Sequence, residues 1–448
     1  MKLIIHRGTH TIGGSCIEIS SGTHRIILDL GMPLMARDGL ELNQDAIKNP
    51  SIENGILPNV DGLYEGKPPS VTAAILSHPH LDHYGLMDWI HPEIPIYLSE
   101  ESRTLIEVGN IFHPPECVQK KLLDHCRTFK HWASFNIGPF TITSYLMDHS
   151  AFGASSLLIE AEGKRVFYTG DIRGHGRKGK LFRYLVKKPV PDVDCLLMEG
   201  TTLGGTHDVG CHSEKEVEEK LCKVFSEQKD VSFIMAAGSN IDQLVSIYRA
   251  AKKARKTLVL DLYQFHLLQK LREYSQGIPP HPNDGMRILY LPSHANSIVE
   301  GLGRGVLAEY KSRQIKIEEI LERRQELVLR IPLSAMTWIA GEMQKSRPLS
   351  GANFIYSMWT GYLERDPKYQ QFCEDYQLSM TKIHTSGHAY LHDLKRLVGA
   401  LNPKAVVPIH TLAGDEFEKH FADKGKGIAV FRIDDGEPFE ISSTYGRR

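Results

Sequence analysis

The segment ILSHPHLDHYGLM, residues 75–87, constrains the fold more than any other stretch of this chain. It places four side chains that can bind metal ions, His78, His80, Asp82 and His83, directly after the apolar run VTAAILSH. Such a run predicts a buried strand, which would hold the four side chains rigidly. A lone histidine is usually a packed or surface residue, whereas this spacing indicates a metal site at the end of a strand.

Length, charge and cysteine content narrow the class of protein. The 448 residues predict two or three domain-sized units. The net charge of -1 argues against nucleic-acid binding through overall positive charge, so such binding would need a local basic patch. Seven cysteines with no CxxC pair favour a reducing, cytoplasmic location. We expect no signal peptide and no membrane-spanning segment, because no apolar run is long enough.

The order of predicted elements divides the chain into three segments, an expectation that we place at residues 1–203, 204–376 and 377–448. The first segment is rich in strands, predicted at residues 24–31, 71–78, 138–150, 155–171 and 193–202. The second alternates strands and helices, which predicts a parallel sheet with crossover helices and an α/β fold class. In the third, SMTKIHTSGHA leads into a helix, and PKAVVPIHT forms a strand that ends in His410.

Seven potential metal ligands stand at or just after predicted strand ends: His78, His80, Asp82, His83, His149, Asp171 and His410. Imidazoles and carboxylates suit catalytic zinc, manganese or iron, whereas closed structural zinc sites more often use cysteines. Seven ligands are too many for one tetrahedral ion and suit two, with one carboxylate as a bridge. Two ions about 3.5–4 Å apart are the usual arrangement for in-line attack on a phosphodiester.

These motifs resemble a known family. The pattern His-x-His-x-Asp-His, followed by the TGD that ends in Asp171, is similar to that of the metallo-β-lactamase fold. Asp29 matches the Asp that supports the ligands in that family. The tail HTSGHAYLHDLKRLVGALNPKAVVPIHT resembles the β-CASP branch, and most nearly the ribonuclease J family. The resemblance implies a metallo-β-lactamase αββα sandwich in residues 1–203 and 377–448, with a β-CASP α/β domain inserted at 204–376.

The resemblance also implies roles for the site residues. One divalent ion, Zn2+ or Mn2+, would be held by His78, His80 and His149, and a second by Asp82, His83 and His410. Asp171 would bridge the two ions, and a bridging hydroxide would be the nucleophile. His388 would be the general acid that protonates the departing 3′ oxygen, and Glu199 would orient it.

Several residues are candidates for substrate contacts, and the substrate implied is single-stranded RNA. His384, Ser386 and Gly387 flank the proposed general acid. Arg173 and Arg177 begin a basic run that starts at Asp171 and continues through Lys188, which fits a focused phosphate track. The alternative for this run is a solvated helix face. Ser239 and Asn240 stand at a predicted helix start, where they would bind phosphate or simply cap the helix.

The leading interpretation is therefore a metal-dependent ribonuclease that cuts by an exonucleolytic 5′–3′ mode, an endonucleolytic mode, or both. A single-stranded DNA nuclease of the same branch is one alternative. A small-molecule ester or phosphodiester hydrolase on the same fold is another, and a nuclease-like subunit that only binds RNA is a third. Only 38 residues follow His410, too few for the further C-terminal domain of ribonuclease J, so a homo-oligomer stays open.

Overall fold

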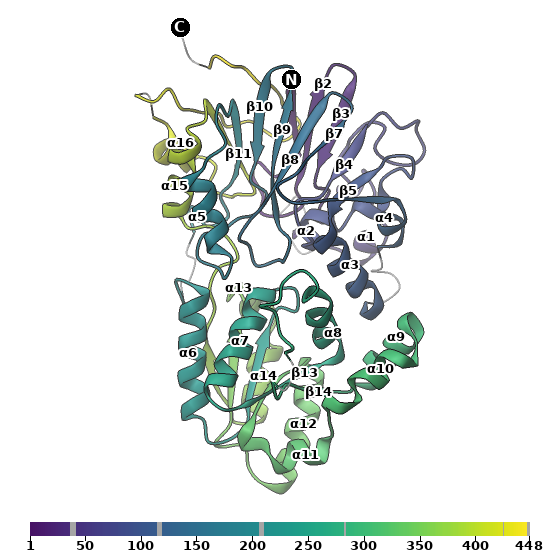
Figure 1. Cartoon of the computed structure of the whole chain (residues 1–448), viewed down its shortest axis with the longest axis vertical. Helices are drawn as coiled ribbons and strands as arrows, with labels where there is room; N and C mark the ends of the chain where they lie inside the picture. Colours follow the sequence, from purple (N-terminus) through teal and green to yellow (C-terminus); the bar gives the residue numbers. More distant parts are fainter. Residues whose placement is uncertain (36–41, 114–118, 206–209, 282–283, 424, 446–448) are drawn as a thin grey trace. The chain divides into compact units, whose positions relative to one another are not determined.

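The chain forms two compact units (Figure 1). The computed structural model describes residues 1–35, 42–113, 119–205, 210–281, 284–423 and 425–445. The first unit comprises Met1–Ile106, Pro115–His207 and Gly387–Arg448, and the second comprises Glu107–Pro114 and Asp208–Ser386. The first unit is thus assembled from both ends of the chain, and almost all of the second is one continuous insertion.

The first unit contains two mixed sheets of seven strands each, with a shared apolar core between them. One sheet has the order β21-β1-β2-β3-β4-β5-β6 and consists of Pro438–Glu440, Lys2–Arg7, Cys16–Ser21, His24–Leu28, Ala73–Ile75, Ile96–Ser99 and Cys126–Phe129. The other has the order β20-β19-β11-β10-β9-β8-β7 and consists of Ala429–Val430, Ala405–Ile409, Cys195–Glu199, Lys164–Tyr168, Ser155–Ala161, Phe140–Leu146 and Ser134–Ile137.

Helices cover the outer face of each sheet, which completes an αββα sandwich. Successive residues of a strand point to opposite faces, so Val166 and Tyr168 of β10 join the core between the sheets. Phe167 of the same strand joins the core beneath the helices on the outer face. Those helices are α5 (Gly179–Lys187), α15 (Leu391–Leu401) and α16 (Glu416–Phe421). The other sheet is covered by α1 (Gln44–Lys48), α2 (Leu81–Tyr84), α3 (Glu100–Phe112) and α4 (Lys120–His125).

The second unit is built on a parallel sheet of seven strands, as the strand–helix alternation predicts. The sheet has the order β15-β14-β13-β16-β12-β17-β18 and consists of Gln314–Ile315, Arg287–Leu289, Thr257–Asp261, Leu327–Arg330, Ser232–Ala236, Asn353–Ser357 and Ser379–Lys382. Its helices are α6 (Glu214–Glu227), α7 (Ile241–Lys253), α8 (Leu262–Leu271), α9 (Pro292–Leu302), α10 (Arg304–Tyr310), α11 (Ile317–Glu322), α12 (Leu333–Ser346), α13 (Gly361–Arg365) and α14 (Lys368–Asp375). The α/β fold class with an inserted parallel-sheet unit is therefore confirmed.

Two details differ from the sequence prediction. Strand β4 has only three residues, although the apolar run extends from 71 to 78, because the residues after Ile75 leave the sheet to present the metal-binding side chains. Residues from 377 on were placed in the first domain, but β18 pairs in parallel with β17 and belongs to the second unit. The segment SMTK is polar and has no buried residue, so its sequence carries no strand signal.

Six cysteines lie in the described part of the chain, and all six are free; Cys117 lies outside it. Among the described residues, no helix has both the length and the apolar character that crossing a membrane requires.

Candidate metal centre

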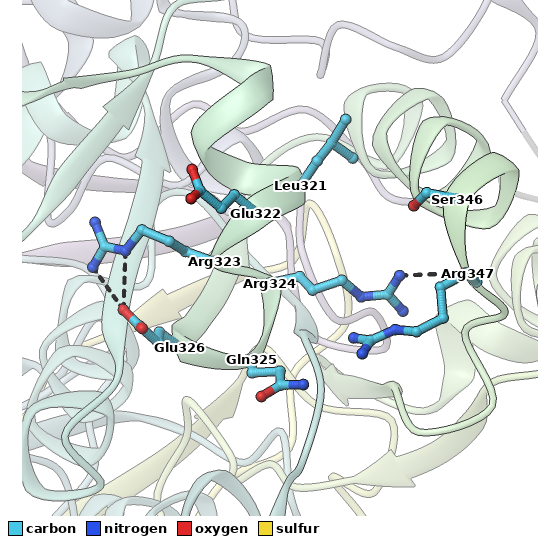
Figure 2. A pocket seen from close by; sticks show the side chains of 8 residues that line it. All are labelled: Leu321, Glu322, Arg323, Arg324, Gln325, Glu326, Ser346 and Arg347. Atoms are coloured by element: carbon cyan, nitrogen blue, oxygen red, sulfur yellow. Dashed lines mark hydrogen bonds and ion pairs between the residues drawn. The ribbon is translucent and has the colours of Figure 1, made fainter.

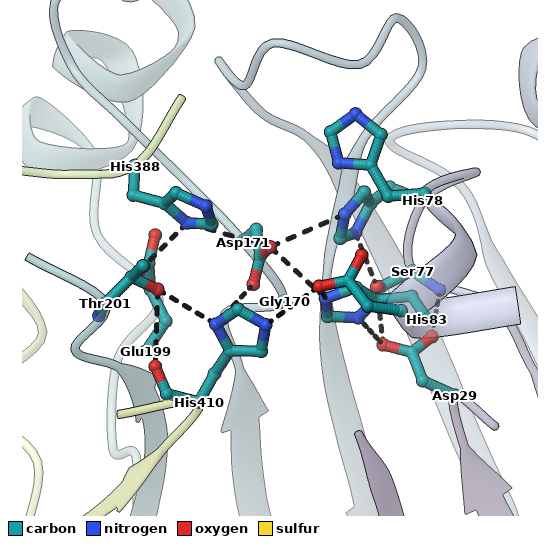
Figure 3. A network of polar contacts seen from close by, with 12 residues as sticks. Asp29, Ser77, His78, His83, Gly170, Asp171, Glu199, Thr201, His388 and His410 are labelled. Atoms are coloured by element: carbon teal, nitrogen blue, oxygen red, sulfur yellow. Dashed lines mark hydrogen bonds and ion pairs between the residues drawn. The ribbon is translucent and has the colours of Figure 1, made fainter. Parts of the chain in front are cut away.

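A network of hydrogen bonds around Asp29 holds the turn that carries the His-x-His-x-Asp-His motif (Figure 3). Oδ1 of Asp29 accepts from the backbone N–H of Ser77 at 2.7 Å, and Oδ2 accepts from the Ser77 hydroxyl at 2.7 Å. Oδ2 also accepts from the Tyr168 hydroxyl at 2.5 Å and lies 2.8 Å from Nδ1 of His83. Because a carboxylate only accepts, Nδ1 of His83 is the donor, which leaves Nε2 as the ring nitrogen that can bind a metal ion.

The backbone of residues 30–32, which follows Asp29, also forms hydrogen bonds with the metal-binding motif. Leu30 donates its N–H to the carbonyl of His83 at 2.9 Å, and Met32 donates to the carbonyl of Leu81 at 2.9 Å. Gly31 lies between them, and a Cβ added there would meet the carbonyl oxygen of Asp82 at 1.7 Å. Only glycine fits this close approach, so Gly31 helps to fix the position of the motif.

The structure brings all seven predicted ligands together from separate strand ends. The ligand atoms of His78, His80, His149 and Asp171 lie within 4.8 Å of one another, and so do those of Asp82, His83, Asp171 and His410. Asp171 belongs to both groups. Its Oδ2 lies 3.5 Å from Nε2 of His78 and 3.2 Å from Nε2 of His83, and its Oδ1 lies 3.8 Å from Nδ1 of His410.

The donor atoms of this cluster fit a divalent cation. Nε2 of His78, Nε2 of His83 and both carboxylate oxygens of Asp171 are buried without a hydrogen-bond partner. A buried polar atom without a partner costs free energy, and a metal ion that accepts its lone pair removes that cost. Imidazole nitrogens and carboxylate oxygens are ligands for zinc and manganese.

Burial and neighbouring charges give the ligands of the cluster different protonation states. Burial, followed by repulsion from neighbouring imidazoles, lowers the pKa of His78 and His149, so both rings are neutral near pH 7. Burial by itself would raise the pKa of Asp82, but attraction to His83 and His410 outweighs it and holds the pKa well below its usual range. The neutral rings of His78 and His149 are ready to bind a cation. Burial would lower the pKa of His83, but attraction to Asp171 and Asp82 outweighs it and raises the pKa, so a metal ion would displace a proton from this ring.

His388 and Glu199 form a second arrangement beside the cluster. Nδ1 of His388 lies 3.3 Å from Oε2 of Glu199 and 3.7 Å from Oδ2 of Asp171. Glu199 is fully buried, and Oε1 accepts from the N–H of Ile172 at 3.0 Å. Burial lowers the pKa of His388, but attraction to Glu199 and then to Asp171 outweighs it and raises the pKa to about 9. His388 is therefore a protonated imidazolium near neutral pH.

The residues predicted to contact the substrate are distributed over both units of the chain. Gly387 lies in the first unit close to Ser150, whose Oγ would be 2.9 Å from an added Cβ. Arg177 is half-buried. Ser239, Asn240, His384 and Ser386 belong to the second unit.

Two of these predictions need correction. Arg173 is completely buried, with Nε 3.8 Å from Oδ1 of Asp148, so it holds the loop after Asp171 rather than offering its guanidinium to a phosphate. Asn240 is 6% exposed, and its side chain accepts from the N–H of Gln243, which makes it the N-cap of α7. Both side chains are buried and have partners within the protein, so they stabilise the fold instead of binding substrate.

The sequence reasoning missed several residues that support the site. Thr201 lies with Oγ1 2.8 Å from Nδ1 of His410, although the two residues are 209 positions apart. Oδ2 of Asp148 accepts from the N–H of Gly176 at 2.7 Å. Thr201 and Asp148 adjoin predicted site residues, so proximity in sequence was a usable signal. Tyr168, which donates to Asp29, gave none, because it ends the apolar run Val-Phe-Tyr of its strand and has the pattern of a core residue.

The described chain also has a hollow of about 290 Å³ in the second unit, lined by Leu321, Glu322, Arg323, Arg324, Gln325, Glu326, Ser346 and Arg347 (Figure 2). Its arginines already have carboxylate partners. Arg323 pairs with Glu319 and Glu326, and Arg324 pairs with Asp230. Arg347 lies 3.5 Å from the same Asp230. Because these charges are compensated, the hollow has no free cation for a ligand and includes none of the predicted site residues.

Comparison with known families identifies two segments. A model described as the beta-lactamase superfamily domain matches residues 57–227. A model described as the Zn-dependent metallo-hydrolase RNA specificity domain matches residues 376–431. The first match contains six of the seven clustered ligands, and the second contains His388 and His410.

Relatives cover most of this chain. Ribonuclease J from Sinorhizobium meliloti is 22% identical over 378 residues, which is 79% of this chain and 60% of the relative. Ribonuclease J from Helicobacter pylori is 22% identical over 458 aligned residues, 98% of this chain and 60% of the relative. The chain thus spans about three fifths of the length of these relatives.

A solved structure gives independent support for the fold. The crystal structure of a protein of unknown function from Enterococcus faecalis V583 has a TM-score of 0.76 and 21% identity, and covers 98% of this chain and 99% of that one. At this identity the likeness concerns the fold alone. The two family models and the ribonuclease J relatives support a metallo-β-lactamase protein of the β-CASP, ribonuclease J-like type.

Proposed function

We propose that this protein is a metal-dependent nuclease that hydrolyses phosphodiester bonds of single-stranded RNA. The observation that carries the proposal is the position of Asp171, whose two unbonded oxygens are shared by two groups of metal-ligand side chains. A single buried carboxylate in both groups supports a site for two ions, which is the arrangement used for phosphodiester hydrolysis. The relatives that bear the name ribonuclease J, and the family model for RNA specificity, support RNA as the substrate.

In this proposal, His78, His80 and His149 would hold one ion, Asp82, His83 and His410 would hold the other, and Asp171 would belong to both sites. The bound ions, zinc or manganese, would lower the pKa of a water and neutralise charge on the phosphoryl oxygens.

His388 supplies the proton that the cleavage needs. Its imidazolium, with the pKa raised to about 9, is charged at neutral pH and donates a proton to the departing 3′ oxygen. The carboxylate of Glu199 keeps the ring oriented through Nδ1. General acid catalysis by a positioned side chain contributes about 10²–10⁴-fold to the rate. The free cysteines fit a reducing, cytoplasmic location for this reaction.

The test compares cleavage of 5′-labelled single-stranded RNA and DNA of the same sequence, with manganese or zinc, by wild type, Asp82→Ala and His388→Ala. His392→Ala is a matched control, because His392 is an exposed histidine four positions from His388. We expect wild type and His392→Ala to cut RNA, Asp82→Ala to be inactive, and His388→Ala to lose about 10²–10⁴-fold.

The other outcomes point to specific alternatives. Cleavage of DNA in preference to RNA would identify a DNA nuclease of the same branch. Activity on a chromogenic phosphodiester or ester with none on nucleic acid would identify a small-molecule hydrolase. Wild-type protein that binds RNA but never cuts it would be a nuclease-like binding subunit. The product ladder distinguishes 5′–3′ exonucleolytic from endonucleolytic cleavage.

A further inference from the structure

Helix α5 carries a stripe of exposed side chains on the outer face of the first unit. Lys180, Arg183, Tyr184 and Lys187 stand at helical spacings of three and four residues, and all four are exposed. Phe182 and Leu185, on the other side of the helix, are buried in the core. We define the α5 face as the four stripe residues together with Lys188, which follows the helix, and Trp132.

The charge of the α5 face is strongly positive and uncompensated. No aspartate or glutamate occurs between Asp171 and Asp192 in the sequence. None of the four cations of the face forms an ion pair within the described part of the chain. By contrast, Arg396 of the neighbouring helix α15 lies 2.9 Å from the carboxylate of buried Asp393. In a chain of net charge -1, three unpaired cations on one helix and a fourth directly after it produce a local attraction for a polyanion.

Two aromatic rings stand among these cations. Trp132 is 42% exposed and Tyr184 is 47% exposed, and their ring centroids lie 5.5 Å apart in an edge-to-face arrangement. Nζ of Lys188 lies 5.4 Å from the centroid of the Tyr184 ring. Tyr145 supports the other side of Trp132 at 5.3 Å. Exposed rings flanked by cations are the combination with which proteins bind unpaired bases and their phosphates.

The α5 face lies a short distance along the chain from the metal-ligand cluster. Gly176 and Lys178, in the loop before α5, donate their backbone N–H groups to Asp148, the residue before His149. Nζ of Lys178 donates to the carbonyl of His149 at 3.0 Å. The helix then extends nine residues, about 14 Å, from this anchored loop. A strand that enters the cluster can therefore continue onto the face.

We propose that the α5 face is an auxiliary binding surface for single-stranded RNA. It holds the part of the strand that extends beyond the cleavage site: phosphates contact Lys180, Arg183 and Lys187, and unpaired bases stack on Trp132 and Tyr184. This inference rests on the proposed function and specifies its substrate, since it favours long unpaired strands over short ones. Cations and exposed rings on one face match the phosphates and bases of a single strand, and the proposed function already brings such a strand to this unit.

The first test is a double charge reversal, Arg183→Glu with Lys187→Glu, compared with Lys223→Glu plus Lys229→Glu. The control residues are exposed lysines of the second unit, so both variants change the net charge similarly. Binding is measured in an Asp82→Ala background, which leaves the strand uncut, with single strands of about 30 and about 5 nucleotides. Cleavage of the short strand is measured separately without the Asp82 change.

We expect the α5 variant to bind the long strand at least about tenfold more weakly, while the control pair binds it as before. The slope of log affinity against log salt should become shallower by about 0.7 for each phosphate that the variant no longer neutralises. Binding and cleavage of the short strand should not change. Equal binding of the long strand by the two variants would overturn the inference.

The second test separates stacking from charge. Tyr184→Ala and Trp132→Ala should each weaken binding of the long single strand roughly tenfold, whereas Tyr184→Phe, which keeps the ring, should not. None of these changes should affect binding of a duplex, whose bases are already stacked. Equal losses for single strand and duplex would overturn base stacking on this face. A wild-type protein that cuts no RNA would overturn the proposed function, while these binding measurements would still decide the inference.

Discussion

Two buried aspartates, one in each unit, show how the same side chain can serve stability or function. Asp230 of the second unit receives a bidentate pair from Arg324, with Nε and Nη2 each 2.6 Å from a different carboxylate oxygen. Asp230 also accepts the N–H of Val231 at 2.8 Å. Asp171 of the first unit is equally buried, but neither of its oxygens has a hydrogen-bond partner.

The two aspartates differ in whether their carboxylate oxygens remain available to bind a metal ion. The charge of Asp230 is neutralised within the protein, so this pair contributes to a folded structure that needs no ligand. Around Asp171, imidazole nitrogens approach to between 3.2 and 3.8 Å without a hydrogen bond that satisfies the carboxylate. A cation is the partner that would satisfy all of these lone pairs together. Buried polar groups without a hydrogen-bond partner therefore indicate the metal site, whereas buried polar groups with partners stabilise the fold.

The largest expected effect comes from Asp171→Asn. The amide keeps the shape of the carboxylate but loses the negative charge, so bound metal should fall sharply and RNA cleavage should drop at least about 1,000-fold. Metal content is measured by mass spectrometry and cleavage by the labelled-RNA assay. Asp192→Asn, at an exposed aspartate, is the matched control. Full metal content in the Asp171 variant would show that this carboxylate is not shared by the ions.

Arg324→Met should produce the opposite pattern. It removes the bidentate partner of buried Asp230 and leaves only Arg347, whose Nη2 lies 3.5 Å from Oδ2, so we expect a loss of about 3–5 kcal/mol of stability. Urea unfolding measures this loss, while metal content and cleavage under stable conditions should stay unchanged. Arg323→Met is the control, because Arg323 is only partly buried, with 36% of its side chain exposed, and each of its ion pairs is worth at most about 1 kcal/mol. Similar losses for both variants would contradict the contrast between buried and exposed pairs.

Asp29→Ala tests a residue that touches a ligand rather than the metal. Without this carboxylate, Nδ1 of His83 loses its acceptor, Ser77 loses two hydrogen bonds and Tyr168 loses one. Removing such a supporting group lowers metal affinity by about 10–100-fold. Titration with a competing chelator measures the affinity. The control Asp61→Ala, at an exposed aspartate of the same unit, should leave metal affinity unchanged.

The smallest expected effect is a pH-dependent change in the stability of the first unit, caused by Glu18. Burial would raise the pKa of Glu18, but hydrogen bonds from Arg25 and His6 outweigh it and lower the pKa from 4.5 to about 2. Since the folded-state pKa is the lower one, the stabilisation is complete above pH 4.5 and disappears as the pH falls through 2. Glu18→Gln should therefore lose about 1.5–3 kcal/mol at pH 7. Unfolding curves across this range should converge at the acidic end, and a constant difference would exclude the ionised carboxylate as the cause.

Much of the site was predictable because its signals are local. The four ligands of residues 78–83 follow a short strand, and His149, Asp171 and His410 each follow a strand that its apolar residues identify. Parallel strands of one sheet end at the same edge, so strand-end residues gather there. Strand β18 escaped prediction, because its polar residues pair only through the backbone.

Tertiary structure alone decided which polar groups are satisfied. Arg173 and Arg183 have the same side chain and lie in the same basic run, yet the first is buried beside Asp148 and the second is exposed on the α5 face. Likewise Thr201 reaches His410 across 209 positions of chain. The sequence by itself determined the chemistry of the ligands and the order of the strands, because residue type and periodicity are local properties. The partner of each buried group depends on distant segments that meet only when the core has packed.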